Sequence, residues 1–326
     1  MEVNHLLSDD SMDGCSIVIR CFNEEEHIGR LLSGIMQQTI KDVEIILVDS
    51  GSTDATVSIA SRYPVKIVPI KPEEFSFGRS LNLGCAEASR DFIVIASAHV
   101  YPVYKDWLEN LLSPFKDPDV AIVYGKQRGD KFARYTEHQI YRKWFPEESA
   151  GRQAHPFCNN ANAAIRRTTW RHLPYNEELT GLEDLDWANR VVDLGKKIVY
   201  CAEAEIIHVH NETLLNIYNR YKREAIAFKK IYPQEHFNFM DFVKLLMANI
   251  LTDYYHALKD RVFMKCILSI PEFRFMQFWG TYRGFGQRGD IPQMLRNRFY
   301  YPNSLSQNTY AKTGGDSARR IHYEHH

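Results

Sequence analysis

The sequence predicts an α/β protein in which a doubly wound, mainly parallel sheet is followed by a helical C-terminal region. In the first half of the chain, short β-branched runs alternate with amphipathic segments. Runs such as IILV and IVIA are apolar on consecutive residues, as expected of strands buried on both faces of a sheet. Beyond Glu212 the apolar residues recur at helical spacing instead. With 326 residues, 44% of them hydrophobic, the chain can bury one large core and a smaller appendage.

The first half is expected to contain alternating strands and helices. The strands are 16–20, 44–49, 65–68, 92–96 and 120–124, and the helices are 24–38, 55–62 and 79–88. In a doubly wound sheet, ligands bind outside the carboxyl ends of the strands. The residues that follow these strands are therefore the first candidates for a site.

The second half begins with a helix after Gly181 that Gly195 closes, followed by a strand at 197–200 and an extended run at 204–210. Helices at 214–231 and 239–258 come next, and Pro271 interrupts an aromatic-rich stretch at 262–279. The expected organisation is a flexible N-terminus at 1–13, an α/β domain at 14–212, a helical region at 213–303 and a polar tail at 304–326.

The composition is that of an ordinary globular protein, and we expect it in the cytoplasm. No segment reaches the ~18 uninterrupted apolar residues of a spanning helix, and the acidic N-terminus does not resemble a secretion signal. The six cysteines are scattered without a CxxC pair, so reduced structural thiols are expected.

The net charge of -1 conceals an asymmetry, because the chain from Thr213 onward has 17 Lys and Arg against 9 Asp and Glu. This basic region suits an anionic membrane surface, and no nucleic acid is expected as a partner. The alternative is that its helices pack on the α/β domain or form a homodimer interface.

Polar residues follow three of the expected strands. Arg20 to Asn23 leave the first strand, and Asn23 is placed to cap the helix that starts near Glu24. Asp49 ends the second strand before a turn at 50–54, where its carboxylate can accept from a pyrimidine N–H. Another strand runs into Ser97-Ala98-His99, whose imidazole can ligate a metal ion.

Taken together, these segments resemble the family-2 glycosyltransferases, whose catalytic domain has the GT-A fold. The resemblance covers roughly Gly14 to Thr213 and rests on LVDSGSTDAT, PEEFSFGRSLNLGCAEA, the 102–107 continuation, GLEDLDW and IIHVH. The VDSGSTD wording with EF-x-x-GR-x-x-N-x-G is most similar to bacterial surface-polysaccharide transferases, including rhamnosyltransferases. Each motif is weak alone, whereas five in the family's order are a strong signal.

The resemblance implies roles for residues at the strand ends. In the family, the residue that matches Asp49 contacts the nucleobase, and the basic residue that matches Arg79 lies near the base or the phosphates. The expected contacts with the donor, a UDP- or dTDP-sugar, are Arg20, Phe22, Asn23, Glu24, Asp49, Ser50, Arg79, Asn82, Ser97 and Ala98.

The family usually holds a divalent ion, Mn²⁺ or Mg²⁺, with two carboxylates spaced as Asp-x-Asp, but here Ser97 and His99 take these positions. Either the ion is held by fewer protein ligands or the enzyme works without one. An Asp-x-His version in polypeptide N-acetylgalactosaminyltransferases indicates that His99 can replace the second carboxylate. His208 and His210 project to the same face of a strand, and one of the two is expected to join His99.

The acidic pair Glu183-Asp184 stands where the family has its catalytic carboxylates. Transfer with inversion needs a carboxylate that takes the proton of the acceptor hydroxyl, and Asp184 is the expected base. Glu183 is expected to contact the acceptor or to position the base, and Asn160 and Trp187 are candidates for the acceptor site. Without the surrounding motifs, these residues would be ordinary helix-start, turn and core residues.

The sequence therefore predicts an enzyme that moves a sugar from a nucleotide-diphosphate donor to a glycan or lipid-linked acceptor. A sugar-phosphate nucleotidyltransferase is the first alternative, but it needs a glycine-rich basic loop soon after the first strand, and CFNEEEHIG is not such a loop. The second alternative is a non-catalytic glycan-binding protein on a degenerate transferase domain. Ser97 favours this alternative, and the retained Glu183-Asp184 pair argues against it.

Overall fold

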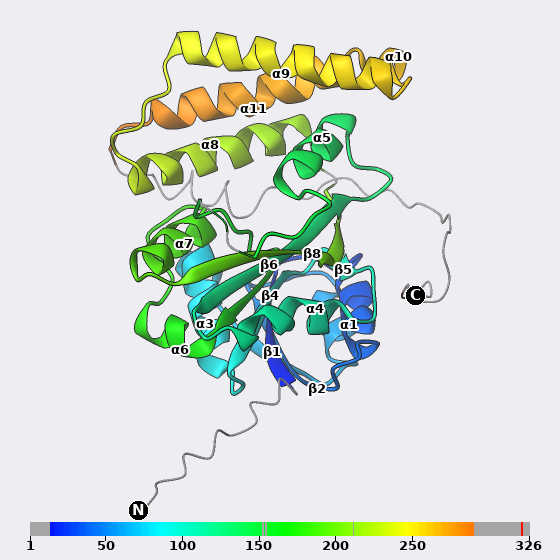
Figure 1. The fold of residues 1–326 in the computed structure, drawn as a ribbon, viewed down its shortest axis with the longest axis vertical. Coiled ribbons are helices and arrows are strands. Elements are labelled where there is room, and N and C mark those ends of the chain that lie inside the picture. Colours follow the sequence, from blue (N-terminus) through cyan, green and yellow to red (C-terminus); the bar gives the residue numbers. More distant parts are fainter. Residues whose placement is uncertain (1–13, 152, 154, 211, 290–320, 322–326) are drawn as a thin grey trace, which may run out of the picture.

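The computed structural model describes residues 14–151, 153, 155–210, 212–289 and 321, which form a sheet domain covered at one end by long helices (Figure 1). The strands are β1 (Gly14–Cys21), β2 (Asp42–Asp49), β3 (Val65–Pro69), β4 (Phe92–Ser97), β5 (Val100–Pro102), β6 (Val120–Gly129), β7 (Asn162–Arg166) and β8 (Lys197–His208). They form one sheet in the order β3-β2-β1-β4-β7-β6-β8-β5.

The sheet is mainly parallel, as predicted. β1 runs parallel to β2 and β4, β2 to β3, and β6 to β8, whereas β7 and β5 run antiparallel to their neighbours. The register pairs Cys21 with Asp49 and Arg20 with Ser97. The ends of β1, β2 and β4 therefore meet at one edge of the sheet, where the sequence predicted a site.

Helices cover both faces of this sheet. They are α1 (Ile28–Met36), α2 (Thr56–Ala60), α3 (Phe77–Glu87), α4 (Trp107–Leu112), α5 (Tyr135–Trp144), α6 (Arg167–His172) and α7 (Glu183–Asp193), with short 3₁₀ turns η1 (Pro72–Glu74) and η2 (Ser113–Lys116). Along β1, Ile17 and Ile19 join the core that contains Leu31, while Val18 joins the opposite core with Leu81. Burial on both faces explains why the strands are apolar on consecutive residues.

The five expected strands of the first half are confirmed, and three details of the prediction are wrong. Asn23 does not cap a helix: α1 starts at Ile28, Asn23 has φ 54°, and its Oδ1 accepts from the Thr53 amide. The runs at 197–200 and 204–210 belong to one strand, β8, which ends at His208. Pro271 lies in the first turn of α11 and does not interrupt it, because backbone N–H groups of the first turn have no partner within the helix.

The second layer consists of α8 (Leu214–Ile231), α9 (Phe239–Lys259), the short α10 (Phe263–Cys266) and α11 (Ser269–Phe285). Two glycines let α11 lie directly on α8: a Cβ at Gly280 would be 2.5 Å from the Tyr218 carbonyl oxygen, and one at Gly284 would be 2.6 Å from that of Lys222. α9 packs on the far side of α11 and is the outermost element (Figure 1).

Within the described residues, no helix has the length and apolarity needed to cross a bilayer. All six cysteines are buried and free, as expected. The proposed flexible N-terminus at 1–13 and the polar tail at 304–326, apart from Ile321, lie outside the described residues.

Candidate functional site

The loops after β1 and β2 are tied together around Asp49. The Asp49 side chain is buried, and its Oδ2 accepts from the amides of Gly51 (3.2 Å) and Ser52 (3.1 Å). The Asn23 amide donates to Ser52 Oγ at 2.9 Å, and the Glu24 amide donates to Thr56 Oγ1 at 2.7 Å. This network fixes the turn of the expected nucleoside pocket and the residues that leave β1.

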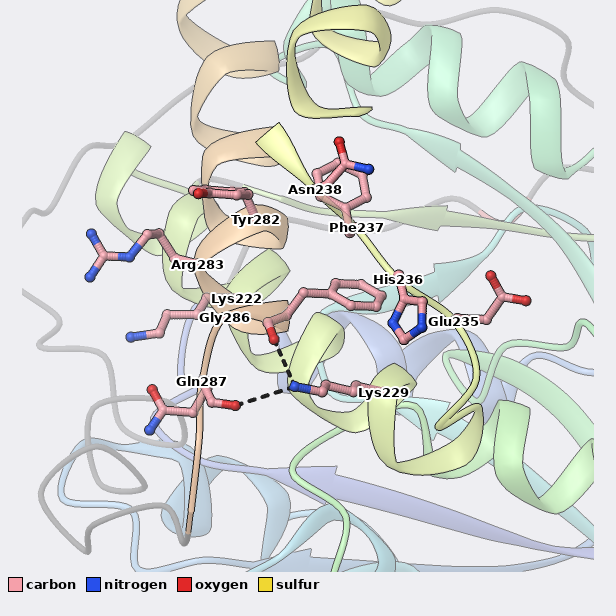
Figure 2. A pocket seen from close by; sticks show the side chains of 11 residues that line it. Lys222, Lys229, Glu235, His236, Phe237, Asn238, Tyr282, Arg283, Gly286 and Gln287 are labelled. Carbon is pink, nitrogen blue, oxygen red and sulfur yellow. Dashed lines mark hydrogen bonds between the residues drawn. The ribbon is translucent and has the colours of Figure 1, made fainter. Parts of the chain in front are cut away.

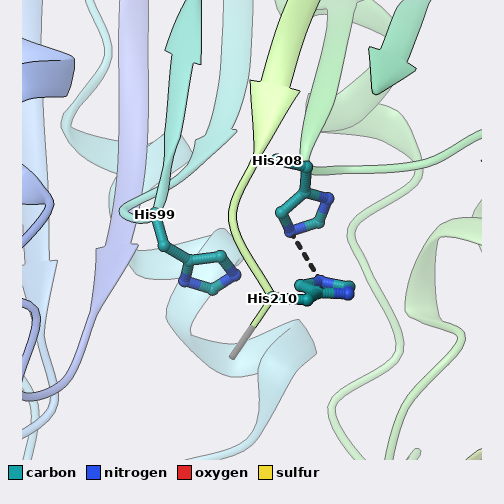
Figure 3. Close-up of side chains that lie close together, drawn as sticks. All are labelled: His99, His208 and His210. Atoms are coloured by element: carbon teal, nitrogen blue, oxygen red, sulfur yellow. Dashed lines mark hydrogen bonds between the residues drawn. The ribbon is translucent and has the colours of Figure 1, made fainter. Parts of the chain in front are cut away.

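Three histidines converge at the same end of the sheet (Figure 3). His99 follows β4, His208 ends β8, and His210 lies two residues further on. The Val209 amide donates to the His99 carbonyl at 3.0 Å, which holds the two segments side by side. One ring nitrogen of each histidine lies within 4.8 Å of those of the other two. The structure thus brings both candidate histidines to His99, where the sequence expected one.

Each imidazole has an oxygen atom close to its Nδ1. The partners are Glu24 Oε1 for His99 (2.7 Å), Gln127 Oε1 for His208 (2.8 Å) and Glu137 Oε1 for His210 (3.4 Å). At His99 and His208, an Nδ1–H that donates to these oxygens leaves the Nε2 lone pair available to an ion. This is the usual orientation of histidine ligands in metal sites.

The spacing of the nitrogens of His208 and His210 fits a single ion. The Nε2 atoms of His208 and His210 are 3.0 Å apart. Two nitrogens bound to one ion at about 2.1 Å lie roughly 3.0–3.4 Å from each other. These side chains are therefore suited to a transition ion, which imidazole binds more readily than Mg²⁺.

Burial sets the protonation of two of these rings. Together with neighbouring positive charge, it holds the pKa of His208 well below its ordinary value, and it also lowers the pKa of His210. Burial acts on His99 in the same direction, but the charge and hydrogen bond of Glu24 outweigh it and leave the pKa of His99 above 6.5. Neutral rings at His208 and His210 are the form that binds a metal ion.

A second group of polar side chains surrounds His210. Glu137, His210 and Glu212 could also share an ion, since one ligand atom of each lies within 4.8 Å of the others. Arg220 of α8 pairs with Glu212 at 2.8 Å and lies 3.4 Å from His210 Nδ1. The helical layer therefore contributes directly to this end of the site.

The expected base lies at the start of α7. Arg20 Nη1 of β1 pairs with Glu183 Oε1 at 2.9 Å, which fixes the acidic pair beside the ends of β1 and β4. The Asp184 carboxylate accepts from the amides of Leu185 (2.8 Å) and Asn160 (3.3 Å). Burial first, and then the charge of Glu183, raise the pKa of Asp184 to about 7. A carboxylate that titrates near neutrality is well matched to general-base catalysis.

The acceptor candidates differ in their surroundings. Asn160 is buried against Asp184, and its Nδ2 has no hydrogen-bond partner among the described residues, so this amide can donate to a ligand. Trp187 is 1% exposed, packs against Tyr175 and donates its indole N–H to the Leu173 carbonyl. We therefore assign Trp187 to the core, because a ligand could reach its ring only if the packing opened.

Several expected donor contacts are occupied within the protein. Asn82 donates to the Tyr175 carbonyl (2.9 Å) and accepts from the Tyr175 amide (3.0 Å), so it anchors the segment before α7. Arg79 lies 3.6 Å from both Glu74 and Glu177. Ser50 Oγ donates to the Cys21 carbonyl at 3.1 Å.

The remaining expected donor contacts stay at the strand ends. Ala98 is buried between them. Phe22 and Ser97 are half-buried there.

Sequence reasoning missed the partners that orient the histidines. Gln127 is 81 residues from His208, and Glu137 lies on α5, so no spacing rule connects them to the strand ends. Arg223 was also missed: its guanidinium lies 4.7 Å from the centre of the Phe77 ring, over which Arg20 also lies at 5.0 Å. The only available signal was the basic charge of the region that contains α8.

A separate cleft of about 360 Å³ lies between α8 and the end of α11 (Figure 2). Lys222, Lys229, Glu235, His236 and Arg283 are among its lining residues. None of the expected donor, metal or base residues lines it.

Comparison with known proteins identifies relatives. The family described as Glycosyl transferase family 2 matches residues 16–173. The O-antigen chain rhamnosyltransferase RfbN of Salmonella typhimurium is 32% identical over 219 residues, which cover 63% of this chain and 69% of RfbN. The O-antigen chain rhamnosyltransferase WbaN of Salmonella anatum is 34% identical over 197 residues, or 57% of this chain and 62% of WbaN. The match with WbaN thus spans less than two thirds of its length.

Solved structures share the fold. One is the mannosyltransferase PcManGT from Pyrobaculum calidifontis in complex with GDP-Man and Mn²⁺, with a TM-score of 0.55 at 16% identity. The match covers 89% of this chain and 88% of the PcManGT chain. GalNAc-T7 with UDP, GalNAc and Mn²⁺ has a TM-score of 0.53 at 15% identity, and the match covers 74% of this chain and 51% of the GalNAc-T7 chain. Since RfbN is matched over more than two thirds of its length, the chain belongs to glycosyl transferase family 2 and has the GT-A fold.

Proposed function

We propose that the protein transfers one sugar, with inversion, from a nucleotide-diphosphate donor to a glycan or lipid-linked acceptor in surface-polysaccharide biosynthesis. The observation that carries the proposal is the half-buried Asp184, whose pKa is raised to about 7 and which adjoins the Glu183–Arg20 pair at the sheet edge. Two relatives are rhamnosyltransferases by name. Rhamnose on dTDP or UDP is therefore the first donor to test.

Asp49 receives the base of the donor, because its carboxylate is held at the edge by two amides. His99, His208 and His210 hold a divalent ion, which neutralises charge on the diphosphate leaving group when bound. Ser97 leaves the usual first carboxylate missing, so in this proposal three imidazoles replace the carboxylate pair.

Asp184 accepts the proton of the acceptor hydroxyl as that oxygen attacks the anomeric carbon. The new carbon–oxygen bond forms while the bond to the diphosphate breaks, and the nucleoside diphosphate leaves with the electron pair. Glu183 is a positioning residue: its charge raises the pKa of Asp184, and its salt bridge with Arg20 fixes the start of α7.

A non-catalytic glycan-binding protein is the second candidate, because Ser97 stands where the family has a carboxylate. The two candidates differ in one measurable way. An enzyme releases nucleoside diphosphate from its donor, slowly to water and faster to an acceptor, whereas a binding protein releases none.

A thermal-shift screen of nucleotide sugars with and without Mn²⁺, followed by a nucleoside diphosphate release assay, tests the proposal. Donor at about 100 times its dissociation constant should stabilise the fold by about 2.7 kcal/mol. Stabilisation by a donor together with diphosphate release supports the transferase. Stabilisation by a glycan, with no release from any donor, would establish the binding protein instead.

A further inference from the structure

Helix α9 is apolar on two faces. Its inner face packs on α11 through Phe242 and Ala257. Its outer face carries an exposed row that we call the outer stripe, spaced at three, four or seven residues: Met240, Met247, Leu251, Tyr255 and Leu258. These side chains are 51–65% exposed. A contiguous row of exposed apolar side chains usually marks a surface that protein or lipid covers.

The apolar surface continues past the end of α9. Met264 of α10 is 79% exposed, and Leu268, just before α11, is 73% exposed. α9 packs on α10 and α11 and is the outermost helix of the layer (Figure 1). Nothing in the described part of the chain covers the outer stripe.

Cations surround the stripe. Lys244 lies within it, and Lys259, Arg261 and Lys265 follow at its end; all four are exposed, and none has an ion-pair partner among the described residues.

Several nearby carboxylates are already engaged. Asp260 accepts from Tyr135 (2.8 Å) and Arg142 (3.2 Å), Asp253 is buried with Arg274, and Asp241 caps its own helix. Glu272 is exposed on α11. The surface as a whole favours an anionic partner.

More cations lie at the other end of α9. Asn238, its N-cap, also lines the cleft that contains Lys222, His236 and Arg283. In Figure 2 the side chains of Lys222 and Arg283 extend toward the same side. Positive charge therefore stands at the C-terminal end of the outer stripe and in the cleft beside the N-cap of α9, a distribution that suits the interface of an anionic bilayer.

We propose that the outer stripe docks the protein on an anionic phospholipid bilayer, with its apolar side chains at the headgroup–acyl boundary and the flanking cations on lipid phosphates. This goes beyond the proposed function and depends on none of its catalytic assignments. A symmetric dimer through the same face would place a basic patch against its own copy, because a two-fold interface is self-complementary. α8 packs beneath α11 and carries Arg220 to the histidine cluster, so the docked layer adjoins the site.

Co-sedimentation of the full chain with phosphatidylcholine vesicles containing 0, 20 or 40% phosphatidylglycerol, at low and high salt, tests this. Bound protein should rise with phosphatidylglycerol and fall with salt. The double variant Met247→Glu with Leu251→Glu should lower the partition coefficient at least tenfold. The matched control is Leu194→Glu, because Leu194 after α7 is 61% exposed, as Leu251 is, and should leave the partition unchanged.

Charge is tested separately. Lys244→Glu with Lys259→Glu should weaken binding to 40% phosphatidylglycerol by at least about 30-fold and change binding to neutral vesicles little. Circular dichroism melting confirms that each variant is folded. Wild-type protein that stays in the supernatant at low salt overturns the proposal. A second pair of results would also overturn it. Light scattering would show a concentration-dependent dimer that Met247→Glu with Leu251→Glu dissociates, and none of the variants would change vesicle binding.

Discussion

The edge of the sheet and the outer helix depart from ordinary burial in opposite ways. At the edge, ionisable groups such as Asp49, Glu183 and His208 are buried away from water. On α9, Leu251 and Tyr255 are exposed to it. Buried polar groups are tolerated when other groups form hydrogen bonds or ion pairs with them. Apolar rows on the surface of a single chain usually mark a site where a partner binds. The edge therefore satisfies most of its buried polar groups within the fold, whereas no described residue covers the outer face of α9.

The largest expected effect concerns a buried ion pair inside the helical layer. Arg274 and Asp253 form two bonds of 2.9 Å and are buried between α9 and α11. Asp253→Ala leaves a buried cation without its partner, and the unfolding free energy should fall by about 3–5 kcal/mol. Urea denaturation measures it.

Glu272→Ala, an exposed carboxylate on α11, is the control for that experiment. The double variant Asp253→Leu with Arg274→Met should recover most of the stability, because an apolar pair of similar size replaces the ion pair. A loss below 1 kcal/mol in Asp253→Ala would mean that this pair behaves like a surface salt bridge.

The next effect tests the base at the sheet edge. Asp184→Asn should reduce turnover by roughly 10² or more with donor affinity nearly unchanged, because the carboxylate acts mainly in the transition state. Steady-state kinetics and donor titration separate the two quantities. Asp186→Asn is the control, since Asp186 lies on the same helix and pairs with Arg190 at 2.9 Å. Near-normal turnover in Asp184→Asn would rule out the assignment.

The histidine cluster should respond more moderately. His99→Ala should weaken Mn²⁺-dependent donor binding roughly 10–100-fold. This is the range found when residues that hold metal ligands in place are mutated. His99→Asp should restore part of the binding, because it regains the family's usual carboxylate. Isothermal titration with and without Mn²⁺ is the measurement. His236→Ala, an exposed histidine in the cleft, should titrate as wild type does, and a normal titration of His99→Ala would refute the ligand role.

The smallest effects concern pH. Because the pKa of Asp184 is raised to about 7, turnover should fall roughly tenfold per unit as the pH drops below that value. Between about pH 4 and pH 7 the folded state holds a proton on Asp184 that the unfolded state has already lost near 3.8. The unfolding free energy should therefore decrease as the pH rises from about 4 to 7. Asp184→Asn removes this dependence and should melt higher than wild type at pH 8. Equal melting shifts at pH 5 and pH 8 would contradict the raised pKa.

Part of the site could be predicted because parallel strands place their ends at one edge. Asp49 ends β2, and His99 lies two residues after the end of β4. The position of each therefore follows from the apolar periodicity of the strands and their order in the chain. The choice between His208 and His210 could not be made, because both project to one face and only their distances to His99 show that both converge. Asn23 was misassigned because its conformation depends on a contact with Thr53, on the loop after β2.

The sequence by itself determined the alternation of strands and helices from β1 to β4, the edge that bears the site and the identity of its charged groups, since these follow from local periodicity and chain order. Only the tertiary structure decided which oxygens orient the histidines, why Asp184 titrates near neutrality and which face of α9 is left uncovered. Each of these depends on groups distant in sequence that desolvate, bond or cover one another. Apolar periodicity marks both faces of α9 as suitable for burial, but only the packing of α11 on one of them shows that no described residue covers the other.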